Sequence, residues 1–88
     1  MEISSFTNQE VEITSVYFRN SSNEHIKSYP KRMVYEGREY TFIEDGLRYL
    51  INTSQQLVKL FDVSDGKAQY RLRQDETNNW TLVGIKAY

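Results

Sequence analysis

Apolar and polar residues alternate along the chain on both sides of an Asp-Gly pair, Asp65-Gly66. Alternation with a period of two predicts strands that bury one face, and Asp-Gly between two such strands favours a two-residue type I′ turn. The predicted strands run over residues 57–63 and 67–74, and the turn places Val63 opposite Ala68. The apolar residues of both strands then share one face of a sheet.

Similar patterns divide most of the remaining chain into strands and turns. Pro30 lacks the N–H group that a central strand donates, so the stretch that contains it belongs at a sheet edge or a bulge. The further predicted elements are a strand over 11–18, a short strand over 25–29, a hairpin over 31–43 and a final strand from 80 to 87 or 88.

Two turns that contain glycine predict a common apolar face across three strands. A two-residue turn at Glu36-Gly37 places Met33 opposite Tyr40. A longer loop with a bulge is an alternative there, because Glu must adopt a left-handed conformation in the short turn. A type I′ turn at Asp45-Gly46 then pairs the next two strands. The residues that point the same way are Met33, Tyr40, Phe42, Tyr49 and Ile51.

Residues 46–61 also fit a helix. Apolar residues recur there at helical spacing, and Asp45 is a candidate N-cap. However, the run 52–54 (Asn-Thr-Ser) would lie in the middle of that helix, where such side chains compete with the backbone hydrogen bonds. Strands are therefore favoured, and an α+β fold with one helix near 46–61 is the alternative.

The register of the final strand has two solutions. A four-residue loop after the preceding strand would turn Val83 and Ile85 toward the core, whereas a five-residue loop would turn Trp80 and Leu82 there. A slip of one residue exchanges the two faces, so the sequence leaves both open.

Length and composition favour one small β domain. With 88 residues, we expect a single domain over 11–88, preceded by a polar, flexible segment over 1–10. Aromatic residues make up 14% of the chain, which suits a small β core. We predict an all-β fold, an antiparallel meander of about six or seven strands that forms a partly open barrel or a twisted sheet.

Several classes of protein are disfavoured by what the chain lacks. The absence of cysteine excludes disulfides, thiolate nucleophiles and cysteine-bound metals. The residues after Met1 are polar, and no apolar run approaches the length of a membrane span, so we expect a cytoplasmic protein with no membrane partner. A net charge of −1 gives no general attraction to nucleic acid.

Catalytic chemistry is not expected. His25 is the only histidine, and it lies in a polar stretch beside Glu24. The acidic turn over 62–66 lacks most of the oxygen ligands of a calcium loop, and three of the four glycines lie in predicted turns rather than in a phosphate-binding loop. We therefore expect no enzymatic activity, cofactor or bound metal.

The sheet face opposite the aromatic core, here the outer face, carries more aliphatic side chains than a solvated face tolerates. Closure into a barrel, the N-terminal strand or a second copy of the chain would each cover them. The candidate interface residues are Val34, Ile43, Leu50, Val58 and Leu60.

Arginines are distributed among these aliphatic residues. Arginine beside aromatic rings on a sheet is how small β-barrels bind single-stranded nucleic acid. Ion pairs with Glu39 and Asp62 on the same face would explain the arginines more simply. The candidate binding residues are Arg32, Arg48, Arg71, Arg73, Tyr29 and Trp80.

The sequence thus predicts a non-enzymatic binding module that acts through a protein partner or as a homodimer. Binding of single-stranded nucleic acid by the arginine and aromatic face is the alternative and is less favoured.

Overall fold

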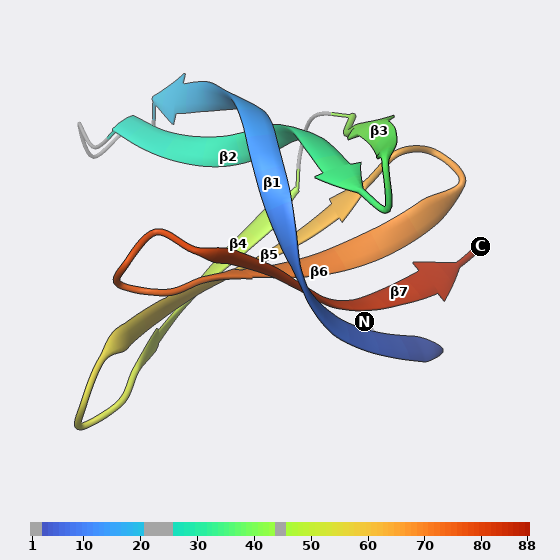
Figure 1. Cartoon of the computed structure of the whole chain (residues 1–88). Coiled ribbons are helices and arrows are strands. Elements are labelled where there is room, and N and C mark those ends of the chain that lie inside the picture. The colour runs from blue at the N-terminus through green and yellow to red at the C-terminus, as the bar shows by residue number, and fades with distance from the viewer. Residues whose placement is uncertain (1–2, 21–25, 44–45) are drawn as a thin grey trace.

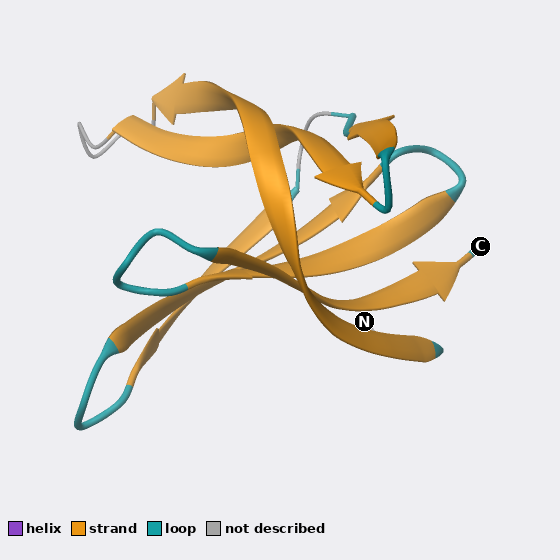
Figure 2. Cartoon of the chain, viewed as in Figure 1, coloured by secondary structure: helices purple, strands orange, loops and turns teal. Residues whose placement is uncertain are grey.

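The computed structural model describes residues 3–20, 26–43 and 46–88, and every regular element within these ranges is a strand (Figures 1 and 2). This confirms the all-β prediction and excludes the helix over 46–61. The strands are β1 (Ser5–Asn20), β2 (Ile26–Tyr35), β3 (Arg38–Thr41), β4 (Leu47–Asn52), β5 (Leu57–Ser64), β6 (Ala68–Gln74) and β7 (Trp80–Ala87).

The seven strands form one antiparallel sheet in the order β3-β2-β1-β7-β6-β5-β4. Strands that follow one another in the chain are neighbours in the sheet, except β3 and β4, which form its two edges. The sheet is therefore a twisted meander that does not close into a barrel, as the sequence predicted.

The long strand β1 belongs to both halves of the sheet. Its residues 5–11 pair with β7, from Ser5 opposite Ile85 to Val11 opposite Trp80, and its residues 12–20 pair with β2. Figure 1 shows β1 passing from one group of strands to the other. We call β2, β3 and residues 12–20 the β2–β3 leaf, and we call β4 to β7 and residues 5–11 the β4–β7 leaf.

The first strand begins at Ser5, whereas the sequence predicted it to begin at Val11. Among the described strands, β7 alone pairs with residues 5–11. The side chains of these residues lie largely in solvent, and their sequence shows no apolar alternation. The register shifts between Phe6 and Gln9, where Asn8 has a φ of 48°. A strand that is irregular and polar leaves little trace in the sequence.

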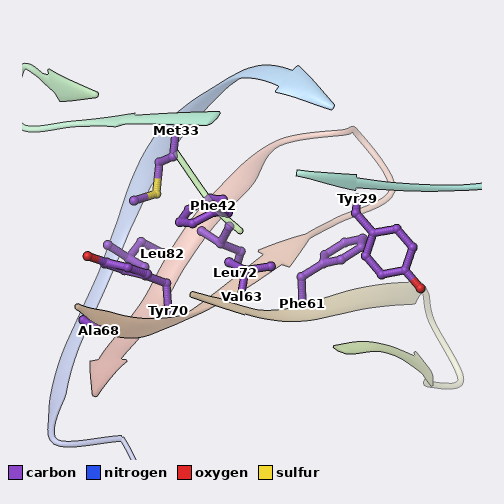
Figure 3. Close-up of a cluster of buried hydrophobic side chains, with 9 residues drawn as sticks. All are labelled: Tyr29, Met33, Phe42, Phe61, Val63, Ala68, Tyr70, Leu72 and Leu82. Carbon is purple, nitrogen blue, oxygen red and sulfur yellow. The ribbon is translucent and has the colours of Figure 1, made fainter. Parts of the chain in front are cut away.

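The core lies between the two leaves. Met33 and Phe42 come from the β2–β3 leaf and the segment that follows it, and they face Phe61, Leu72 and Leu82 on the other leaf (Figure 3). All of these side chains are fully or almost fully buried. The remaining buried members of the cluster are Tyr29, Val63, Ala68 and Tyr70.

The β2–β3 hairpin has the predicted register. Met33 lies opposite Tyr40, and the two turn residues Glu36 and Gly37 have φ angles of 52° and 75°. Positive φ at both positions is the mark of a type I′ turn, so the alternative with a longer loop is excluded. Pro30 lies within β2, next to a register shift against β1, as its missing N–H group predicted.

The β5–β6 hairpin is present, but its predicted register was wrong by two residues. Val63 lies opposite Tyr70 rather than Ala68, because the two-residue turn is formed by Gly66 and Lys67. Gly66 has a φ of 92° at the first turn position, where a type II′ turn requires glycine. A shift of two residues keeps every side chain on its predicted face, since side chains alternate with a period of two.

The predicted hairpin at Asp45-Gly46 was wrong. Asp45 lies outside the described residues, and the strands on either side of the predicted turn are the two edges of the sheet. After β3 the chain passes to β5 instead: the N–H of Ile43 donates to the carbonyl of Ser64 at 2.8 Å. Phe42 stays buried as predicted, whereas Tyr49 and Ile51 are partly exposed.

The final strand follows the five-residue loop, and a bulge later in the strand turns Ile85 inward as well. The loop has five residues, with Gln74 opposite Trp80, and Leu82 is fully buried opposite Leu72. The register then shifts, so that Tyr70 lies opposite Ile85, which packs against the core. The bulge adds one residue to β7, which lets both Leu82 and Ile85 face inward.

Candidate interaction surface

The edge strand β4 exposes apolar side chains along its whole length. Leu47 is 58% exposed, Leu50 55%, Ile51 43% and Tyr49 41%. Beyond the strand, Leu57 at the start of β5 is also exposed. We call these five residues the β4 patch; they form a concentration of apolar surface that a solvated edge strand normally avoids.

The apolar residues of β4 lie on both faces of the sheet. Tyr49 pairs with Leu60 and Ile51 with Val58, which places them on the outer face. Leu50 pairs with Lys59 on the inner face, two residues from the pair between Arg48 and buried Phe61. Each face of this edge therefore carries at least one apolar side chain that is partly in solvent.

The sequence prediction placed Arg48 and Leu50 on the outer face and Tyr49 and Ile51 on the inner face, and this was wrong. The prediction derived the facing of β4 from a hairpin with β3. The actual neighbour is β5, whose register turns β4 the other way. A signal for the exposed residues exists in the sequence: the adjacent Leu50 and Ile51 place an apolar residue on each face.

The opposite edge of the sheet is built differently. Strand β3 has only four residues, Arg38–Thr41, and it includes Arg38 and Glu39, which are both exposed. Short, charged edge strands discourage pairing with other chains. Strand β4 has six residues, of which Arg48 is the only charged one.

Arg71, a predicted binding residue, is held by an acidic neighbour on the outer face. Its guanidinium donates two hydrogen bonds to Asp62, Nε to Oδ1 and Nη2 to Oδ2, both 2.8 Å long. The Asp62 residue is only 8% exposed. These hydrogen bonds raise the pKa of Arg71, and the pair leaves little free positive charge at this point.

The other three arginines lie apart. Arg73 is exposed on the outer face, opposite Leu60, and Arg32 is exposed on the other leaf. Arg48 lies on the inner face, where its Nε is buried and has no hydrogen-bond partner in the described part of the chain. The four arginines thus do not form one continuous basic surface.

The two predicted aromatic binding residues belong to the core region. Tyr29 is buried, with its ring stacked on Tyr17 at 5.3 Å between centroids. Trp80 packs against the core, with its ring 5.2 Å from that of Phe61. The sequence does not reveal how the two leaves pack over one another, and for Trp80 it leaves a place in the core open.

The other predicted interface residues vary in exposure. Ile43 is largely exposed, Leu60 is half-buried, and Val58 is buried by its neighbours. Val34 is half-buried and lines an open groove with Glu10, Glu12 and Trp80, where β1 leaves β7 and joins β2.

The second open groove contains a structured turn. The carboxylate of Asp65 accepts hydrogen bonds from the N–H groups of Lys67 and Ala68 and from the hydroxyl of Tyr70, at 2.8, 2.9 and 2.8 Å. Burial raises the pKa of Asp65, but these hydrogen bonds outweigh it and hold the pKa below its usual value. Burial, together with the hydrogen bond to Asp65, raises the pKa of Tyr70.

Two further properties bear on chemistry. Within residues 3–20, 26–43 and 46–88, no three histidine, cysteine, aspartate or glutamate side chains are grouped so that they could hold a metal ion. His25 lies outside these ranges. Over the same residues, no helix has the length and apolar character needed to cross a membrane.

Comparisons of the chain with protein-family models, with curated proteins and with solved structures find no significant match.

Proposed function

We propose that the protein is a non-enzymatic cytoplasmic interaction module that binds a protein partner through the β4 patch. The observation that carries this proposal is the exposure of apolar residues on both faces of an edge strand, from Leu47 to Ile51. An unpaired strand edge offers backbone hydrogen bonds to a partner, and flanking apolar side chains add contact area.

The contrast between the two sheet edges supports this proposal. Strand β3 is short and charged, whereas β4 is longer and apolar. Apolar surface in water has an unfavourable free energy of roughly 25 cal/mol per Å², which a partner that covers the surface would remove. Strand β4 has a single charged residue to oppose pairing with another chain, which agrees with a partner chain that pairs with this edge.

Binding of single-stranded nucleic acid has weaker support. Asp62 neutralises Arg71, Tyr29 is buried, and Trp80 is partly buried against the core, which limits the ring surface that could stack on bases. A catalytic role has weak support as well, because the shifted pKa of Asp65 follows from the hydrogen bonds of a turn. The absence of cysteine agrees with a reducing compartment such as the cytoplasm.

Photo-crosslinking in the native host cells tests the proposal. A benzophenone amino acid replaces Leu50 in the full chain, and as a matched control it replaces Phe18, an exposed apolar residue of β1. We expect position 50, and not position 18, to form an adduct with one defined protein sequence, identified by mass spectrometry. No protein adduct at position 50, or an adduct with nucleic acid, would overturn the proposal.

A further inference from the structure

We propose that the partner of β4 is β4 of a second copy of this chain, paired antiparallel with Leu50 opposite Leu50 of that copy. This inference rests on the proposed function, and it names the partner of the same surface. The two sheets then join edge to edge across a twofold axis into one continuous sheet.

A second copy of β4 would contact exposed side chains on both faces of the strand. A ligand that lies on one face would leave the other face in water, since Leu50 is on the inner face and Tyr49 and Ile51 are on the outer face. A neighbouring antiparallel strand satisfies the free backbone groups and also places side chains beside both faces. The second copy supplies the same apolar residues on the same two faces, because the interface is its own complement.

Charge and side-chain pairing select the register. With Leu50 on the axis, Tyr49 lies opposite Ile51 of the second copy, an aromatic and β-branched pair that stabilises sheets. Arg48 then lies opposite Asn52 of the second copy. The amide oxygen of that Asn52 can accept a hydrogen bond from the guanidinium of Arg48.

The registers with Tyr49 or Arg48 on the twofold axis are less favourable. With Tyr49 on the axis, the two Arg48 side chains would lie about 7 Å apart along the strands, and with Arg48 on the axis they would be directly opposed. With Leu50 on the axis they are separated by about 13 Å, which exceeds the screening length at physiological salt. Repulsion between the arginines therefore disfavours the registers centred on Tyr49 and on Arg48, and the pair of Tyr49 with Ile51 favours the proposed one.

The area of the β4 patch fits a reversible dimer. Its five side chains expose on the order of 500 Å² of apolar surface, near the largest patches that monomers carry. Pairing would bury part of this surface on each copy, together with the strand backbones and polar neighbours, which gives an interface at the small end of the range for specific complexes. We therefore expect a dimer that dissociates on dilution.

Disulfide trapping tests the proposed register. The chain has no cysteine, so a single introduced thiol can only form a bridge between copies. Opposed residues of antiparallel strands have Cα atoms about 4.5–5.5 Å apart, within the range that a disulfide spans. Under mild oxidation of the full chain, we expect Leu50→Cys to form a linked dimer at least tenfold faster than either of two control variants. The controls are Phe18→Cys, on β1, and Thr41→Cys, on the edge strand β3. Equal rates would overturn the proposal.

Analytical ultracentrifugation tests the association itself. At high micromolar concentration, we expect the sedimentation of the unmodified chain to give a molecular mass twice that of the 10.5 kDa monomer. Leu50→Lys should raise the dissociation constant at least tenfold, because a charged edge residue opposes pairing, whereas Phe18→Lys should leave it unchanged. Circular dichroism spectra that match the unmodified chain establish that both variants fold.

The outcomes separate this inference from the proposed function. If the purified chain is a monomer while position 50 crosslinks to one other protein in cells, the inference is overturned and the proposed function stands. If position 50 captures no protein and the chain is a monomer, both are overturned. A dimer that Leu50→Lys leaves intact places the contact elsewhere and overturns the inference.

Discussion

The guanidinium of Arg71 donates two hydrogen bonds of 2.8 Å to the carboxylate of its cross-strand neighbour, Asp62. Asp62 is almost fully buried, whereas the side chain of Arg71 is 24% exposed. Loss of the arginine would therefore leave a buried charge without a partner, whereas loss of the aspartate would leave a charge that water can partly solvate. A cation that a sequence pattern assigns to a ligand can serve the fold instead.

Replacement of Arg71 should destabilise the protein by leaving a buried carboxylate without its partner. We expect Arg71→Met to lower the free energy of unfolding by about 3 kcal/mol. Arg73→Met, on the same strand and exposed, should change it by less than about 0.5 kcal/mol. Urea unfolding followed by circular dichroism measures both. Equal effects of the two substitutions would contradict a structural role for the pair.

Asp65 should contribute to stability that is lost in acid. Its pKa in the folded protein is held below the usual value of about 3.9, so the unfolded chain binds a proton at a higher pH than the folded chain does. Stability therefore falls as the pH drops from about 5 through 3.9 toward the folded pKa. Asp65→Asn should cost about 1 kcal/mol near pH 7 and progressively less in acid.

Urea unfolding at several pH values tests this prediction. Glu39→Gln is the control, because Glu39 is exposed, and its substitution should give a curve parallel to that of the unmodified chain. Part of the acid dependence should survive in Asp65→Asn. The hydrogen bond from Thr77, with others in the same loop, also lowers the pKa of Asp75. A constant difference between Asp65→Asn and the unmodified chain at every pH would contradict the role assigned to Asp65.

The turn between β2 and β3 offers a stabilising substitution. Glu36 has a φ of 52°, in the left-handed region that costs most residues free energy. Glu36→Asn creates the Asn-Gly pair preferred in type I′ turns and should raise the midpoint of thermal unfolding by about 3–5 °C. Glu36→Val, which is β-branched, should lower the midpoint. A shift in the same direction for both would show that backbone strain at this position is unimportant.

Gly84 should not tolerate a side chain. A Cβ atom there would lie 2.9 Å from the carbonyl oxygen of Ser5 and would overlap the side chain of Ile3. Gly84→Ala should therefore push the start of β1 away from β7 and lower the free energy of unfolding by roughly 1–3 kcal/mol. Faster amide hydrogen exchange over residues 5–11, with unchanged exchange in the β2–β3 hairpin, is the expected signature. Gly37, with open space around it but a positive φ, is the comparison, and Gly37→Ala should affect only its own turn.

Local patterns predicted much of the fold. The turn at Glu36-Gly37 and the faces of β5 and β6 follow from residues within a few positions of each turn. Even the register error at Asp65-Gly66 moved no residue to the wrong face, because the shift was two residues. Short-range turn chemistry and the period of two determine these features together.

The errors arose where two strands that follow one another in the chain do not pair, and where burial depends on the contact between the leaves. The pair Asp45-Gly46 is as typical of a turn as the other Gly-containing pairs, yet β3 and β4 do not pair with each other. The faces on which Leu50 and Tyr49 lie follow from the pairing of β4 with β5. The burial of Tyr29 and the packing of Trp80 depend on the contact between the leaves. No pattern within a single stretch of sequence contains that information.

The pairing of Ser5 with Ile85 also has a consequence for biosynthesis. Residues 5–11 leave the ribosome early, but β7, the strand that completes their ladder, is the most C-terminal of the seven. During translation the first part of β1 must wait unpaired while the β2–β3 hairpin and then the β4–β6 ladder become available. The ladder between β1 and β7 therefore cannot form before Trp80–Ala87 is available, and a chain that stalls before Trp80 leaves residues 5–11 open to other strands and to proteases.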